Sequence, residues 1–110
     1  MPTRLPSVIQ SYFDAGAASN YDALVACFTD DAIVVDDGST HRAPAEIRAW
    51  RESLAAAFDF TVEVIEAAES GPSSYVVQTR VAGTFPGSPV DLRYQFTVID
   101  GLVSRLEIAP

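Results

Sequence analysis

The sequence contains no lysine, one cysteine and one histidine, and these shortages exclude several kinds of chemistry. Without an ε-amine, the chain cannot form a lysine Schiff base or attach a pyridoxal cofactor. The single thiol, Cys27, excludes an internal disulfide and is consistent with a reducing compartment, so a cytoplasmic location is expected. A zinc site is not expected either, because common zinc sites combine several histidine, cysteine or carboxylate ligands.

Basic residues and long apolar runs are also scarce. The chain has seven arginines and 15 acidic residues, which give a net charge of −8. A protein that binds nucleic acid needs a basic face, so this balance argues against such a partner. The apolar runs are short and broken by charges, and no apolar segment follows Met1–Arg4. Neither a membrane span nor a secretory signal is therefore expected.

The chain is long enough for one hydrophobic core. It has 110 residues, of which 48% are hydrophobic, and this predicts a single domain over residues 1–110. Apolar residues at helical spacing predict a first helix over residues 5–16. Asn20 is a suitable N-cap for a short second helix, and Pro44 suits the first turn of a third helix that extends to Phe58.

After Phe58 the apolar pattern changes to a period of two residues. It predicts strands over residues 61–68, 75–85, 91–99 and 102–108, in addition to an earlier strand over residues 32–36. Asp100-Gly101 is a strong signal for a two-residue hairpin, whereas Asp37-Gly38-Ser39 is expected to form a turn. Helices followed by strands predict an α+β fold, with about four to six strands in one sheet covered by helices on one face.

Alternation along the strands separates the two faces of this sheet. The inner, apolar face is expected to carry Leu92, Tyr94, Phe96 and Val98, and, from the last strand, Leu102, Ser104, Leu106 and Ile108. Arg80, Arg93 and Arg105 then share the outer face. The pattern thus predicts a polar outer surface across three strands.

Three polar residues are candidates for acid–base chemistry. Asp36 ends an apolar strand and alternates with Val34, so it is either a general base in an apolar pocket or a solvated aspartate that caps the turn. Tyr12 lies on the buried stripe of the first helix and is either a hydrogen-bond donor to a ligand or a core tyrosine. His41, expected in a loop, can act as an acid or base near neutral pH or can simply be solvated.

The remaining motifs predict neither a metal site nor a cofactor site. The pairs Asp30-Asp31 and Asp36-Asp37 offer oxygen ligands, but their spacing matches no metal-binding loop, and no metal site is predicted. There is no phosphate-binding loop, dinucleotide-binding glycine pattern or nucleophile elbow, and no cofactor is expected. Aromatic and apolar residues can instead line a pocket for a flat apolar ligand or form ordinary core; they are Trp50, Phe58, Phe60, Leu92, Tyr94 and Phe96.

Short motifs along almost the whole chain resemble one protein family. They are Tyr12-x-x-Ala15, Phe28-x-Asp30-Asp31-Ala32-x-Val34-x-Asp36, Ile47-Arg48-x-Trp50 and Tyr94-x-Phe96 with Asp100-Gly101-x-Val103-Ser104. The chain resembles the SnoaL-like and ketosteroid-isomerase-like proteins of the nuclear transport factor 2 superfamily. The resemblance implies a cone-shaped domain in which three N-terminal helices pack on a curved, mostly antiparallel sheet. It also implies a homodimer, which the polar outer face could form.

The resemblance assigns roles to two of the candidates. In ketosteroid isomerases, the tyrosine matching Tyr12 donates to the steroid oxyanion, and the aspartate matching Asp36 shuttles the proton. A second, protonated aspartate of those enzymes falls on Leu92 here, while Asp91 is one residue away and faces the opposite side unless a bulge intervenes. Half of the isomerase oxyanion hole is therefore expected to be absent.

These observations predict a protein with a small-molecule pocket and leave three functions open. The first is an acid–base isomerase, cyclase or lyase acting on an apolar carbonyl compound, with Asp36, Tyr12 and His41 as candidate catalytic residues. The second is a non-catalytic binding or association module of the same fold. The third, an epoxide hydrolase, requires an Asp–Arg–Asp cluster around a water, for which the inward-facing Arg51 is the single indication.

Overall fold

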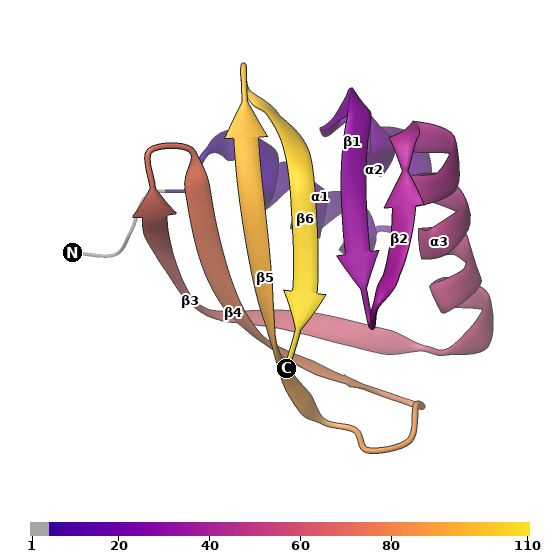
Figure 1. Cartoon of the computed structure of the whole chain (residues 1–110). Helices are drawn as coiled ribbons and strands as arrows, with labels where there is room; N and C mark the ends of the chain where they lie inside the picture. The colour runs from indigo at the N-terminus through magenta and orange to yellow at the C-terminus, as the bar shows by residue number, and fades with distance from the viewer. Residues whose placement is uncertain (1–4) are drawn as a thin grey trace.

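The computed structural model describes residues 5–110 and consists of three helices and a six-stranded sheet (Figure 1). In chain order the elements are α1 (Ser7–Ala17), α2 (Tyr21–Val25), β1 (Phe28–Asp36), β2 (Ser39–Arg42), α3 (Ala43–Ala57), β3 (Phe60–Gly71), β4 (Ser74–Gly83), β5 (Val90–Ile99) and β6 (Leu102–Ala109). The expected α+β class is confirmed. No helix in this part of the chain is long and apolar enough to cross a bilayer.

The sheet is mostly antiparallel. Its strand order is β2-β1-β6-β5-β4-β3, and of its neighbouring pairs β1–β6 is the parallel one. The helices lie together behind the strands in Figure 1, with α3 beside the β2 edge. From the end of α3, β3 extends along the lower side of the sheet to its far edge, where it pairs with β4. The N-terminal elements and the C-terminal strands thus meet in the middle of one sheet.

Two of the tight hairpins have an Asp-Gly pair at the turn. Asp100 and Gly101 have φ of 53° and 78° and connect β5 to β6, as predicted. Asp37 and Gly38 have φ of 50° and 78° and connect β1 to β2. Positive φ at both central residues is typical of the turns that match strand twist. The second hairpin was not predicted, and it places His41 on a strand opposite Val34 rather than in a loop.

The helices bury their apolar faces against the inner face of the sheet. Val8, Ile9, Tyr12 and Ala15 are the buried residues of α1, Leu24 is that of α2, and Ile47, Trp50 and Arg51 are those of α3. The largest fully buried side chains from the sheet include Phe96, Leu106, Val34 and Val77. The predicted apolar stripes therefore form the core that lies beneath the site described below.

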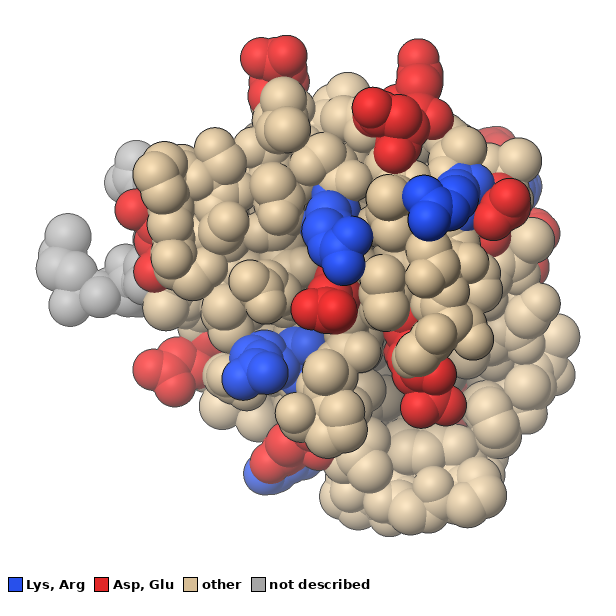
Figure 2. Space-filling model, viewed as in Figure 1, with Lys and Arg blue, Asp and Glu red and all other residues tan. Residues whose placement is uncertain are grey.

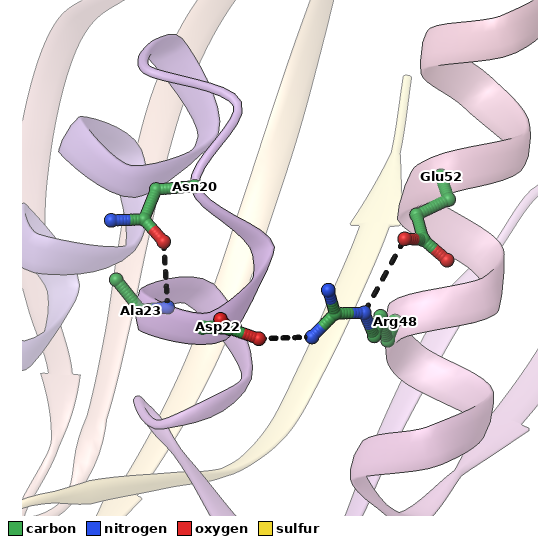
Figure 3. A network of polar contacts seen from close by, with 5 residues as sticks. All are labelled: Asn20, Asp22, Ala23, Arg48 and Glu52. Atoms are coloured by element: carbon green, nitrogen blue, oxygen red, sulfur yellow. Dashed lines mark hydrogen bonds and ion pairs between the residues drawn. The ribbon is translucent and has the colours of Figure 1, made fainter.

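Polar contacts connect the two helices that precede and follow the first hairpin (Figure 3). Asn20 Oδ1 accepts a hydrogen bond of 3.1 Å from the Ala23 amide, which caps α2 as expected. Arg48 on α3 pairs with Asp22 on α2 and, at 3.3 Å, with Glu52 one turn further along α3. These surface contacts connect α2 to α3, the helix that contributes the tryptophan and arginine of the site.

The predicted face of β6 is wrong at its beginning. Arg105 pairs with Thr97 and Val103 pairs with Val98, so Ser104 is an extra residue in the ladder. Such a bulge reverses the alternation. As a result Val103 is fully buried while Leu102 is 36% exposed, whereas Leu106 and Ile108 face inward as predicted. Arg80, Arg93 and Arg105 are exposed on the outer face, also as predicted.

Candidate ligand-binding cavity

A cavity of about 870 Å³ lies between the helices and the inner face of the sheet. This volume is within the range of pockets that enclose small organic ligands. Its inner lining comes from α1, α3 and five strands and includes Tyr12, Phe13, Asp36, Trp50, Arg51, Leu54, Phe58, Phe60, Val81, Leu92, Tyr94 and Ile108. Most of these side chains are apolar. The exposed Asp59, Thr84 and Pro110 also line it and mark a side that opens to solvent.

Asp36 is the half-buried carboxylate of this cavity. It is the last residue of β1, and alternation with the fully buried Val34 turns its side chain inward. Its Oδ2 accepts a hydrogen bond of 3.0 Å from Trp50 Nε1. Trp50 is 7% exposed, as expected for either pocket lining or core. Within residues 5–110 no donor binds Oδ1, so that oxygen is free for a ligand.

Two buried phenols lie near this carboxylate. Tyr12 and Tyr94 are 4% and 7% exposed, and their ring centroids are 6.5 Å apart. Neither hydroxyl has a hydrogen-bond partner in the described part of the chain, yet no fully enclosed side-chain polar atom there lacks a partner. Both hydroxyls must therefore border cavity space.

The protonation of the two phenols follows from their burial. Desolvation raises the pKa of Tyr12 well above its ordinary value, and the electrostatic interaction with the neighbouring Tyr94 adds to this increase. Desolvation likewise raises the pKa of Tyr94. Both groups consequently remain protonated around neutral pH, so each can donate a hydrogen bond to a ligand oxygen.

Arg51 is the cation of the cavity. It is 9% exposed, its guanidinium carbon lies 4.8 Å from the centre of the Phe60 ring, and its Nη2 donates to the Gly16 carbonyl at 3.5 Å. Among the ion pairs of residues 5–110, none involves Arg51. The positive charge of Arg51 lowers the pKa of Tyr12 and of Tyr94, while the negative charge of Asp36 raises both. The two opposite charges therefore act on the same pair of phenols.

The cavity brings together six of the eight predicted site residues. They are Tyr12, Asp36, Trp50, Phe58, Leu92 and Tyr94. Phe96 instead lies in the core beneath Tyr12, with ring centroids 5.6 Å apart. His41 borders a separate shallow groove with Glu46 and Trp50, and its ring centroid is 5.8 Å from that of Trp50.

Asp91 does not reach the cavity. The register between β4 and β5 pairs Arg80 with Asp91 and Thr79 with Leu92 without a bulge. Asp91 is exposed, and Arg80 Nε donates to its Oδ1 at 2.9 Å. This hydrogen bond lowers the pKa of Asp91, so the carboxyl is ionised as well as misplaced. Leu92 lines the cavity at the position where the resemblance led us to look for a second acid.

Arg51 was indicated in the sequence only as an inward-facing residue for the epoxide hydrolase alternative and was not among the predicted site residues. The signal for it was a charged residue expected to face inward. Ile108 was assigned to the inner face of the sheet, and nothing in the sequence distinguishes core from cavity lining. Within the described residues, no group of three or more His, Cys, Asp and Glu side chains is arranged to hold a metal ion.

Residues 9–106 match the SnoaL-like domain family. A comparison with curated proteins finds no significant sequence match. A solved structure of a candidate polyketide cyclase from Sinorhizobium meliloti is 39% identical, with a TM-score of 0.91 and 94% of each chain covered.

Two further structures share the fold at lower identity. A protein from Mycobacterium tuberculosis in complex with estradiol-17beta-hemisuccinate is 20% identical, with a TM-score of 0.79, and the match covers 93% of this chain and 89% of that one. A computationally designed binder of 17-OHP is 21% identical, with a TM-score of 0.80 and coverage of 94% and 90%.

Proposed function

Because the chain belongs to the SnoaL-like family, we propose that its cavity binds a small apolar carbonyl compound and that Asp36 transfers a proton on it. The observation that carries the proposal is the arrangement of one half-buried carboxylate and two protonated phenols in an apolar cavity of about 870 Å³. Structures of the same fold hold a steroid ester or are designed to bind a small molecule, which supports a ligand of that size.

The chemistry proposed for these groups is the abstraction of a proton α to a carbonyl. Asp36 Oδ1 takes the proton, while Trp50 Nε1 holds Oδ2 and fixes the orientation of the carboxylate. The electron pair of the broken C–H bond moves onto the carbonyl oxygen as an enolate. Tyr12 or Tyr94 donates a hydrogen bond to that oxygen. If the enolate is conjugated with a carbon–carbon double bond, Asp36 can return the proton to the far carbon of that system, which completes an isomerisation. In a cyclisation the enolate carbon instead bonds to a second carbonyl carbon, and the oxygen of that carbonyl takes the proton back from Asp36.

The shape proposed for the site is the one-ended cone of this family, with its wide end at the exposed lining residues. The curvature of β3 and β4 toward α3 supports this geometry (Figure 1). His41 lies outside the cavity lining and packs near Trp50. The proposed mechanism therefore assigns no proton transfer to His41, which can act only through its contact with Trp50.

Replacement of Asp36 by asparagine tests the mechanism. Asp36→Asn keeps the shape and can still accept the Trp50 hydrogen bond, but it removes the base. We expect α-proton exchange of a model cyclic ketone in deuterium oxide to slow by about 100-fold or more, as for loss of a general base. Nuclear magnetic resonance follows the exchange, and fluorescence of Trp50, the single tryptophan, follows ketone binding.

The matched control is Asp30→Asn, which makes the same change on the exposed part of the same strand. The control should exchange at the wild-type rate, and both variants should bind the ketone as the wild type does. Equal exchange by wild type and Asp36→Asn would remove Asp36 from the mechanism.

One observation favours a second candidate, a non-catalytic binding protein. Leu92 lines the cavity where a second acid would be expected, so the acidic partner of the phenols is absent. A binding protein would hold the ketone without accelerating its exchange, and the same experiment separates the two functions.

A further inference from the structure

We propose that Arg51 binds a carboxylate of the ligand, so that the ligands of this cavity are apolar carbonyl compounds that carry an acid group. This inference rests on the proposed function only in using the same cavity. It does not depend on whether Asp36 performs catalysis.

The first support is the burial of a cation without a counterion. Arg51 is 9% exposed, and no carboxylate within residues 5–110 forms an ion pair with it. Burying an unpaired charge is costly, because the charge loses its hydration. The face of the Phe60 ring and the Gly16 carbonyl compensate for part of this loss. A carboxylate would compensate more fully, since it accepts two parallel hydrogen bonds from a guanidinium.

The second support is the direction of the free donors. A guanidinium has five N–H groups, and the described contacts of Arg51 use Nη2 alone. No fully enclosed side-chain nitrogen in residues 5–110 lacks a hydrogen-bond partner. Nε and Nη1 of Arg51 must therefore border open space, and the open space at Arg51 is the cavity.

The third support is the placement of Arg51 relative to the reactive groups. Arg51 and Asp36 both act electrostatically on Tyr12 and Tyr94, so all four lie around one region of the cavity. Leu54 lies one turn after Trp50 on α3 and lines the same cavity, as does Phe58. A ligand with its carboxylate on Arg51 would place its apolar body against these side chains and its carbonyl near the phenols.

The net charge of the protein makes this preference diagnostic. At −8, the protein repels anions, and Asp36 adds a negative charge inside the cavity. General electrostatics therefore favours a neutral ligand over its acid. A preference for the acid requires a specific cation, and Arg51 is the one in the described lining.

Calorimetric titration with naphthoate and naphthamide tests the inference, because these flat ligands have nearly the same shape and differ in charge. Hydrogen bonds to charged groups contribute about 1.5–3 kcal/mol, which corresponds to about 10-fold to 100-fold in affinity. We expect the wild type to bind naphthoate at least about tenfold more tightly than naphthamide. Arg51→Met replaces the cation with an uncharged side chain of similar length and should lose this preference.

Two variants complete the design. Arg48 lies one turn before Arg51 on α3, but its side chain points toward Asp22 rather than into the cavity (Figure 3). Arg48→Met therefore removes a cation outside the cavity, and this variant should keep the preference for naphthoate. Arg51→Lys keeps the charge but loses the planar fork, and should retain part of the preference even if Arg51→Met fails to fold.

The outcomes separate this inference from the proposed function. Equal affinity of the wild type for both compounds would overturn the role of Arg51 and leave an apolar binding cavity. Binding of neither compound at millimolar concentration would overturn both the role of Arg51 and the apolar cavity as a ligand site. A preference that survives in Arg51→Met would assign the acid to another group and overturn the inference as well.

Discussion

The carboxylate of Asp36 and the indole of Trp50 form one unit. Residues 14 positions apart in the sequence meet because β1 and α3 pack together, and the indole N–H then fixes one carboxylate oxygen at 3.0 Å. A buried indole needs a hydrogen-bond acceptor, and Asp36 provides it. The contact joins the candidate base to the single tryptophan of the chain, whose fluorescence can be measured separately from that of tyrosine. Ligand binding near Asp36 should therefore change the emission of Trp50.

The buried phenols predict a loss of stability in alkaline solution. Burial raises the folded-state pKa of Tyr12 and Tyr94. Their stabilising contribution to the free energy of unfolding is therefore fully present below the pKa that tyrosine has in the unfolded chain, about 10. It is lost as the pH rises through the folded-state pKa. Between these limits each tyrosine should lower the free energy of unfolding by about 1.4 kcal/mol per pH unit.

Urea unfolding at a series of alkaline pH values measures this slope. The double variant Tyr12→Phe/Tyr94→Phe should show a flatter decline above pH 10. Cys27, whose pKa is also raised by burial, contributes a decline of the same sign in both proteins and so serves as an internal reference. An unchanged slope in the double variant would contradict the assignment.

At the scale of elements, the junction between α3 and β3 closes one side of the cavity. Phe60 begins β3, contacts Arg51 through its ring and pairs with Gly83 on β4. The backbones approach closely there. A Cβ on Gly83 would overlap the Asp59 carbonyl oxygen and lie 2.7 Å from Phe60 Cα. Glycine at this position therefore permits the strand pairing that supports the cavity wall.

Gly83→Ala should accordingly destabilise the protein by about 1–3 kcal/mol or more, the usual effect of forcing additional atoms into a packed site. Gly71→Ala is the matched control at the other end of the same strand pair, since its added Cβ would lie at an ordinary 3.6 Å from Ser74 Cβ. Thermal and urea unfolding compare the two. Similar stability of both variants would show that β3 can shift away from β4 without cost.

At the scale of the whole molecule, the outer face of the sheet is the surface proposed for homodimer formation. It carries Arg80 paired with Asp91, Arg105 at 3.9 Å from Glu107, and the exposed Arg93 and Gln95. Figure 2 shows basic and acidic side chains side by side on this face. A two-fold axis through the sheet would bring such mixed charges against their counterparts in a second copy.

Light scattering at micromolar concentration should report a dimer. Gln95→Lys introduces a long, strongly hydrated side chain on the outer face and should increase the dissociation constant by about tenfold or more, equivalent to about 1.4 kcal/mol. Gln10→Lys makes the same change on an exposed position of α1, where Asp14 can pair with it, and should leave the dimer intact. A monomeric wild type would exclude the interface.

Local rules of the chain predicted much of this protein correctly. The inward direction of Asp36 follows from the two-residue period of a strand, and the burial of Tyr12 and Trp50 follows from the helical period. The Asp100-Gly101 hairpin follows from the positive φ that these residues tolerate. Each of these features depends on residues within a few positions of one another. For that reason the α+β class and most of the candidate site could be predicted.

Tertiary structure decided the remaining features. The bulge at Ser104, which buries Val103, depends on the register between two strands, and the placement of Phe96 in the core depends on α1 packing over it. His41 is separated from the cavity because a second Asp-Gly hairpin adds β2 at the sheet edge. Arg51 belongs to the candidate site because it lines the cavity and forms no ion pair within residues 5–110, which only the folded structure shows. Sequence patterns give the side of an element that is buried, whereas only packing determines whether that side meets other side chains or an open cavity.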